Sequence, residues 1–252
     1  MNKTEEEISK TIKTNKGFNM KIILSGGGSG EDTKEVDEKF ASLLDKNKPL
    51  LYIPIAIDNI KHPYPDCLKW LRLTFDNFGI KNYEMWTEGD LKKSKDVSPS
   101  NFSGIYIGGG NTPYLLKKLK ETGFWEFLKE AIESDIPIYG GSAGATIFSK
   151  TIKYSLYSDK NWVGINELTG MNVLSGYEIM VHYKKEEKDK LINISEENKS
   201  ENIIALTEKN GLYVNSKEVV VIGKEPAFVF NNGKIRNVPV GEVLLIKPNF
   251  KE

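Results

Sequence analysis

One serine stands between glycines where a short apolar run ends. Residues 137–145 are Pro-Ile-Tyr-Gly-Gly-Ser-Ala-Gly-Ala, which places Ser142 in the Gly-x-Ser-x-Gly pattern of a nucleophile elbow between a strand and a helix. Such a turn strains the backbone of the serine and needs glycines to leave room for it. The N–H of Ala143 would then be free to hold an oxyanion. A serine that only caps the helix is the alternative, but the pattern favours a serine hydrolase.

A nucleophilic serine needs a base, and the chain has two histidines, His62 and His182. His62 lies in a loop broken by prolines, where an exposed histidine is the usual case. His182 follows the apolar run 179–181, so it could stand at a strand end, where the elbow needs it. A histidine packed in the core is the alternative interpretation. We predict that His182 is the base.

The base in turn needs a carboxylate to fix its tautomer. Glu208 follows the apolar run 203–206, which is where active-site carboxylates lie in parallel sheets. Asp159 and Glu167 are weaker alternatives, and the carboxylates of 186–189 belong to a charged, solvated helix. The resulting order Ser…His…Glu disfavours an ordinary α/β-hydrolase esterase or lipase, in which the histidine comes last.

Two further glycine clusters follow apolar runs. Residues 108–112 are Gly-Gly-Gly-Asn-Thr, and glycines there would let the backbone approach a substrate and supply a second oxyanion donor. Residues 26–30 are Gly-Gly-Gly-Ser-Gly, which fits neither the dinucleotide fingerprint nor a P-loop. We interpret this first cluster as a tight structural turn.

Alternating strands and helices must position these residues. This order predicts an α/β fold with a mostly parallel sheet flanked by helices, in which ligands gather at the carboxyl ends of strands. From residue 203 onward short strand-like runs predict a strand-rich C-terminal part of the same mixed sheet, with a hairpin turn at Asn-Asn-Gly, 231–233. We expect strands at 21–24, 51–57, 82–86, 104–107 and 136–139, and helices at 33–44, 67–78, 113–120, 124–134 and 186–197.

Composition narrows the class of protein. The 252 residues hold 35 Lys+Arg and 35 Asp+Glu, and this zero net charge argues against nucleic-acid or membrane partners. The single Cys67 fits a reducing compartment, and the polar start has no signal-peptide core, so we expect a cytoplasmic protein. We expect a polar extension over 1–19 and one domain over 20–252. No metal or cofactor is expected, because the two histidines lie far apart and Cys67 has no partner cysteine.

The loop 105–112 and the elbow 139–145 together resemble the aspartyl dipeptidase (dipeptidase E) and cyanophycinase peptidase family. The resemblance extends to Val-His-Tyr at 181–183 and to Leu-Thr-Glu-Lys-Asn-Gly at 206–211, and covers roughly 20–248. It implies a class-I-glutaminase-like three-layer sandwich with a Ser-His-Glu triad. Carried over, Ser142 is the nucleophile, His182 the base and Glu208 the acid, with Gly110 and Ala143 as oxyanion donors.

The chain departs from the family pattern at two places. Thr207 and Lys209 replace the Pro and Gly that flank the family's glutamate. After the elbow, 157–162 replaces an Asn-Asp-Met-Pro-like segment, and Asp159 is its only match. We assign Asn111 and Asp159 to substrate binding.

We therefore predict a serine peptidase that cleaves short peptides, among them dipeptides with an N-terminal Asp. Hydrolysis of isoaspartyl peptides or small esters is one alternative. A catalytically silent binding protein on the same fold is another. The sequence also allows the chain to form a homodimer.

Overall fold

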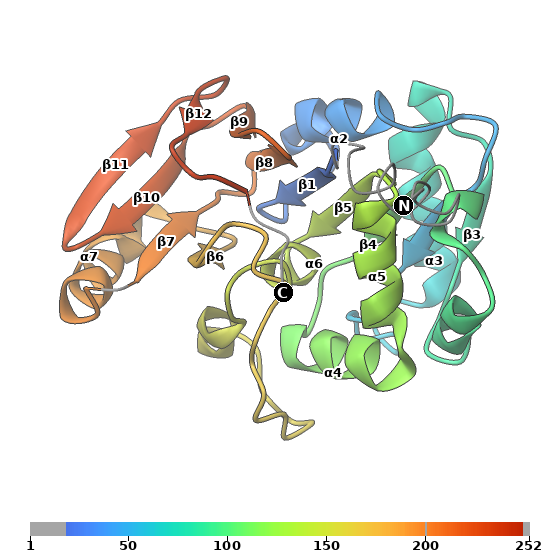
Figure 1. The fold of residues 1–252 in the computed structure, drawn as a ribbon, viewed down its shortest axis with the longest axis horizontal. Coiled ribbons are helices and arrows are strands. Elements are labelled where there is room, and N and C mark those ends of the chain that lie inside the picture. The colour runs from blue at the N-terminus through green and yellow to red at the C-terminus, as the bar shows by residue number, and fades with distance from the viewer. Residues whose placement is uncertain (1–18, 200, 249–252) are drawn as a thin grey trace, which may run out of the picture.

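A mostly parallel sheet forms the centre of the computed structural model, which describes residues 19–199 and 201–248 (Figure 1). Its strand order is β12-β9-β8-β1-β5-β4-β2-β3. The neighbouring strands β1, β5, β4, β2 and β3 run parallel to one another. The antiparallel strands β8, β9 and β12 extend it beyond β1. The bounds are β1 Lys21–Ser25, β2 Leu50–Ile53, β3 Tyr83–Met85, β4 Gly104–Ile107, β5 Ile138–Gly141, β8 Asn210–Asn215, β9 Val219–Gly223 and β12 Val243–Leu244.

Helices cover both faces of this sheet because its strands are apolar on both sides. Helices α2 and α3 pack on one face, where their buried residues join Tyr52, Tyr106 and Tyr139 in one core. Helices α4 and α5 pack on the other face, and the short α6 follows β5. The bounds are α2 Lys34–Ala41, α3 Tyr64–Phe75, α4 Thr112–Thr122, α5 Phe124–Glu133 and α6 Ala143–Thr146. Short 3-10 turns lie at Gly30–Asp32, Asp76–Phe78, Leu91–Lys95, Pro99–Asn101, Lys153–Tyr157 and Lys185–Glu187.

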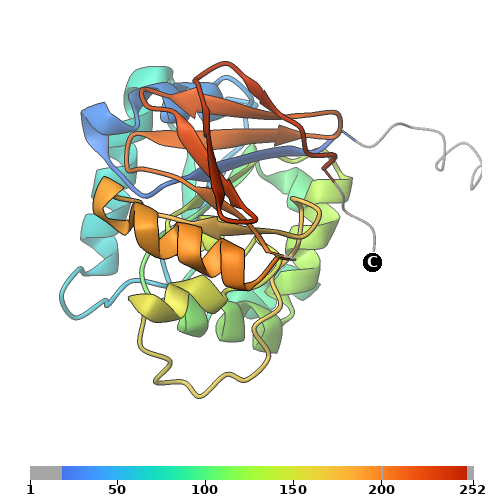
Figure 2. The ribbon, with the colours of Figure 1, turned by 90° about the vertical axis from the view of Figure 1, so that its left-hand side faces the viewer.

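A second, smaller sheet has the order β11-β10-β7-β6. One of its faces contributes Ile179, Ile204 and Val229 to the core that α4 and α5 share, and the other packs under α7. Figure 2 shows α7 lying across the outer side of this sheet. The bounds are β6 Tyr177–Met180, β7 Asn202–Ala205, β10 Ala227–Asn231, β11 Lys234–Val238 and α7 Lys188–Glu197.

The predicted fold class is confirmed, and one part of its topology was wrong. The C-terminal strands do not extend a single mixed sheet: β8, β9 and β12 join the large sheet, whereas β7, β10 and β11 form the small one with β6. The hairpin turn at 231–233 joins β10 to β11, with Asn232 at φ 48° and Gly233 at φ 72°. Strand β2 ends at Ile53 rather than at 57, because Pro54 has no N–H to continue the ladder. The extension expected over 1–19 lies outside the described residues except for Asn19.

Candidate active site

Ser142 stands at the turn between β5 and α6 in a strained conformation, with φ 52° and ψ −112°. Its N–H donates to the Ser25 carbonyl at 3.1 Å, which ties the turn to the end of β1. Only glycine fits on either side of it: a Cβ at Gly140 would lie 2.2 Å from the Gly144 carbonyl oxygen, and one at Gly144 would lie 2.3 Å from that of Ile107. The local geometry is thus that of a nucleophile elbow.

His182 follows β6 of the small sheet and also has a positive φ, 54°. Its backbone N–H donates to the Gly26 carbonyl at 2.9 Å. Gly26 directly follows Ser25, whose carbonyl accepts from Ser142 N–H. This brings the imidazole Nε2 to 2.8 Å from Ser142 Oγ. The end of β1 therefore positions both side chains, one from each sheet.

Glu208 follows β7, which runs parallel to β6 with Ala205 opposite Met180. Because parallel strands end at the same edge of a sheet, Glu208 reaches His182, and its Oε1 lies 2.8 Å from Nδ1. In the tautomer with the proton on Nδ1, this carboxylate accepts a hydrogen bond from Nδ1–H, and Nε2 can accept one from the Ser142 hydroxyl. The side chains of His182 and Glu208 are 42% and 53% exposed, so this pair is open to solvent.

The glycines 26–28 pass between these three residues, a role that sequence analysis missed. A Cβ at Gly26 would lie 1.9 Å from the Thr207 carbonyl oxygen, and one at Gly28 would lie 2.0 Å from that of Glu208. At Gly27, where φ is 109°, it would lie 2.4 Å from His182 Cε1. The tight-turn interpretation was therefore incomplete. Three consecutive glycines directly after a strand were the available signal.

Two backbone N–H groups near Ser142 are without a hydrogen-bond partner among the described residues: Ala143 follows the serine in the chain, and Gly110 lines the same cavity. Within the described ranges, the N–H groups of Ala143 and Gly110 donate no hydrogen bond. Gly110 has φ 137°, and a Cβ there would lie 2.0 Å from the Ala56 carbonyl oxygen. Its neighbour Gly109 packs directly on Ser142, where a Cβ would lie 3.0 Å from that of the serine. The glycine loop after β4 can thus approach a group bound to Ser142.

Asn111 is the N-cap residue of α4, and Asp159, from the segment after the 3-10 turn Lys153–Tyr157, contacts the first residue of the same helix. Asp159 Oδ2 accepts from the N–H and the hydroxyl of Thr112 at 2.9 and 2.7 Å, and its Oδ1 accepts no hydrogen bond in the described part of the chain. The Asn111 side chain caps α4 by accepting from Tyr114 N–H at 3.0 Å, and donates to the Lys160 carbonyl at 2.9 Å. Asp159 keeps a free oxygen for a ligand, whereas both polar atoms of Asn111 are engaged in structure.

A cavity of about 570 Å³ connects these groups. Its lining includes Ser142, His182 and Asp159, together with the exposed Lys184 and Lys190. Among residues 19–199 and 201–248, no carboxylate lies within 4.0 Å of either lysine ammonium. The cavity therefore presents both signs of charge next to the serine.

A buried carboxyl group lies beneath the elbow. Asp37 on α2 is 3% exposed, and accepts from Tyr139 OH at 2.9 Å and from Thr33 Oγ1 at 2.8 Å. Burial raises the pKa of Asp37 to about 6, although both hydroxyls favour its charged form. Tyr139 lies three positions before Ser142 on β5, so this group supports the strand that carries the serine.

Neither a metal centre nor a membrane span is apparent in the described residues. There, no group of three or more His, Cys, Asp or Glu side chains could hold a metal ion. None of the helices in that part is long and apolar enough to cross a bilayer.

Comparison with known proteins matches this geometry to a family. Residues 22–222 match the family model of peptidase family S51. A peptidase E from Shewanella sp. (strain W3-18-1) is 26% identical over 202 residues, which are 71% of this chain and 84% of that protein. An uncharacterized peptidase from Pasteurella multocida is 33% identical over 142 residues, 55% of this chain and 66% of that protein.

A solved structure extends the likeness to the fold. The crystal structure of a peptidase from an acI-B1 Actinobacterium superposes with a TM-score of 0.66 at 20% identity, covering 90% of this chain and 98% of that one. The predicted resemblance is confirmed by the family match and by the peptidase E relatives. Since the family model spans most of the sequence, this chain belongs to peptidase family S51 and is a serine-type peptidase.

Proposed function

We propose that this chain hydrolyses short peptides, dipeptides with an N-terminal Asp among them, through a Ser142-His182-Glu208 triad. The observation that carries the proposal is the row of two 2.8 Å contacts, Ser142 Oγ to His182 Nε2 and His182 Nδ1 to Glu208 Oε1. Such a row lets the imidazole take the serine proton while the carboxylate stabilises the imidazolium that forms.

The proposed reaction has two stages. In the first, Ser142 Oγ attacks the scissile carbonyl as His182 takes its proton, and the oxyanion is held by the N–H groups of Gly110 and Ala143. His182 then protonates the leaving amine, and an acyl-enzyme remains on Ser142. In the second, His182 takes a proton from water, the resulting hydroxide attacks the ester, and Ser142 recovers its proton.

The charges of the cavity support an N-terminal aspartate on the acyl side. The free oxygen of Asp159 can accept a hydrogen bond from the substrate ammonium, and Lys184 and Lys190 can pair with a side-chain carboxylate. Both lysines line the same cavity as Ser142, which supports this assignment.

The net charge of zero and the single buried Cys67 support a cytoplasmic setting with a small peptide as the partner.

The test is hydrolysis of Asp-Leu, Asn-Leu, Ala-Leu and isoAsp-Leu by the wild type and by Ser142→Ala. We expect the wild type to cleave Asp-Leu best and Ser142→Ala to cleave none. Serine-dependent cleavage of isoAsp-Leu alone would instead support the isoaspartyl alternative. Cleavage that persists in Ser142→Ala would refute the mechanism.

A further inference from the structure

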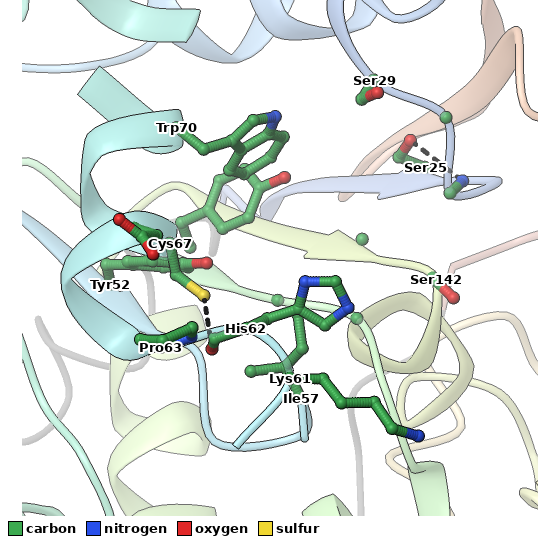
Figure 3. Close-up of a pocket in the computed structure, with 17 residues that line it drawn as sticks. Ser25, Ser29, Tyr52, Ile57, Lys61, His62, Pro63, Cys67, Trp70 and Ser142 are labelled. Carbon is green, nitrogen blue, oxygen red and sulfur yellow. Dashed lines mark hydrogen bonds between the residues drawn. The ribbon is translucent and has the colours of Figure 1, made fainter. Parts of the chain in front are cut away.

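Two cavities meet at Ser142, and in the described part of the chain it is the only residue that lines both. The first is the charged cavity described above. The second has a volume of about 420 Å³ and lies between α3 and the carboxyl ends of β1, β2 and β4 (Figure 3). A peptide whose scissile carbonyl lies on Ser142 extends away from it in two directions. The molecule thus offers one cavity for each half of such a peptide.

His182 itself lines the charged cavity, and the second cavity lies next to its imidazole across Gly27. Gly27 lines the second cavity, and a Cβ on Gly27 would lie 2.4 Å from His182 Cε1. In the proposed reaction His182 has to protonate the leaving nitrogen, so the leaving half must pass close to this ring. Since Asp159 and the two lysines match the acyl half to the charged cavity, the second cavity is left for the leaving residue.

Aromatic rings form the inner walls of this second cavity. Tyr52 and Tyr106 are 4% and 5% exposed, and their ring centroids lie 5.6 Å apart in an edge-to-face pair. Trp70 packs edge-to-face on Tyr106 at 6.1 Å. Figure 3 shows Trp70, Tyr52 and Cys67 at one end of the cavity and Ser142 at the other. Because these rings hold one another in place, the apolar surface exists before any ligand binds.

The charged and ionisable side chains of the lining lie at the mouth instead. Lys61, His62 and Asp66 line the cavity, but all three are exposed to solvent. A charged side chain placed deep among the rings would lose its water and meet no side chain of opposite charge there. An apolar side chain would gain free energy from the same transfer.

We propose that this cavity binds the leaving residue of the peptide and selects an apolar or aromatic side chain there. The inference rests on the proposed function and specifies its substrate class: an acidic residue before the scissile bond and an apolar one after it. Cys67 lies on α3 at the end of the cavity opposite Ser142 (Figure 3), and its thiol donates to the His62 carbonyl at 3.4 Å.

The experiment compares kcat/KM for Asp-Phe and Asp-Gly in the wild type, in Cys67→Phe and in Lys69→Phe. The wild type should prefer Asp-Phe by about tenfold or more, since burial of a phenyl group contributes at least that factor. Cys67→Phe fills the cavity and should reduce the preference for Asp-Phe over Asp-Gly to about twofold or less. Lys69→Phe places the same side chain on the exposed face of α3 and should keep the preference. Trp70→Ala removes a wall instead and should lower the preference too, which tests the cavity if Cys67→Phe does not fold.

The outcomes separate the inference from the function on which it rests. A wild-type preference that neither Cys67→Phe nor Trp70→Ala lowers would overturn the inference and leave the peptidase assignment intact. So would a wild type that cleaves both dipeptides equally. If Cys67→Phe changes the ratio of Asp-Gly to Ala-Gly instead, the cavity serves the acyl half and the inference is wrong. Absence of any Ser142-dependent hydrolysis would overturn the proposed function, and the inference with it.

Discussion

Gly27 offers the sharpest test of how the active site is packed. Its φ of 109° already disfavours any other residue, and a Cβ there would lie 2.4 Å from His182 Cε1 and 2.6 Å from Nε2. Ordinary contact begins at 3.4 Å, so in Gly27→Ala the imidazole has to retreat by about 1 Å. That movement would stretch the 2.8 Å contact between Ser142 Oγ and Nε2 beyond hydrogen-bonding distance.

A displacement of about 1 Å in a catalytic group costs about a hundredfold in rate, and we expect at least this loss of kcat/KM in Gly27→Ala. Gly30→Ala is the matched control. Gly30 belongs to the same loop and has φ 60°, but nothing lies within 4 Å of a Cβ there. Both variants should lose roughly 1 to 2 kcal/mol of stability through the positive φ.

The assay is kcat/KM on Asp-Leu together with thermal unfolding. Only Gly27→Ala should lose activity, while both variants show a similar fall in melting temperature. Wild-type activity in a folded Gly27→Ala would refute the reasoning, because the imidazole would then tolerate a side chain that the geometry excludes.

Three further predictions concern carboxylates. Burial raises the pKa of Asp37 from 3.8 to about 6, so the folded state binds the proton of this carboxyl more tightly than the unfolded state does. The stability that this proton binding contributes is therefore full below pH 4 and is lost as pH rises through 6. Between pH 4 and pH 8, the free energy of unfolding of Asp37→Asn in urea should therefore rise by up to about 3 kcal/mol relative to that of the wild type. A difference between the two proteins that stays constant over this pH range would contradict this. Asp159→Asn should lower kcat/KM at least about tenfold for peptides with a free amino terminus, by loss of a charged hydrogen bond, but not for N-acetylated ones. Glu208→Gln should lower kcat about 10- to 100-fold with an unchanged melting temperature, since this side chain is 53% exposed; an equal loss of stability would argue for a structural role.

The local part of the site was predictable from the sequence. The pattern around Ser142 names the turn because only glycines allow its geometry, and this constraint involves a few consecutive residues. The strand ends before His182 and Glu208 were equally visible as apolar runs. In the structure His182 lies between the other two, 2.8 Å from Ser142 Oγ through Nε2 and 2.8 Å from Glu208 Oε1 through Nδ1.

What the sequence left open depends on contacts between distant segments. The division of the C-terminal strands between two sheets follows from pairings such as β8 with β1, which no periodicity encodes. Asp37 was not recognised because its partners, Thr33 and Tyr139, form a site only after α2 packs on β5. Gly27 was taken for a turn residue because the imidazole it makes room for comes from residue 182.

The proposal that Ser142 is a nucleophile activated by His182 can be tested without knowing the substrate. A fluorophosphonate reagent would be added to the wild type, Ser142→Ala and His182→Ala, and the labelled protein followed by intact mass and peptide mapping. The account predicts one label on Ser142 in the wild type, none in Ser142→Ala, and at least about hundredfold slower labelling in His182→Ala, because the base no longer takes the serine proton. Labelling of another residue, or equal rates in the wild type and His182→Ala, would contradict it.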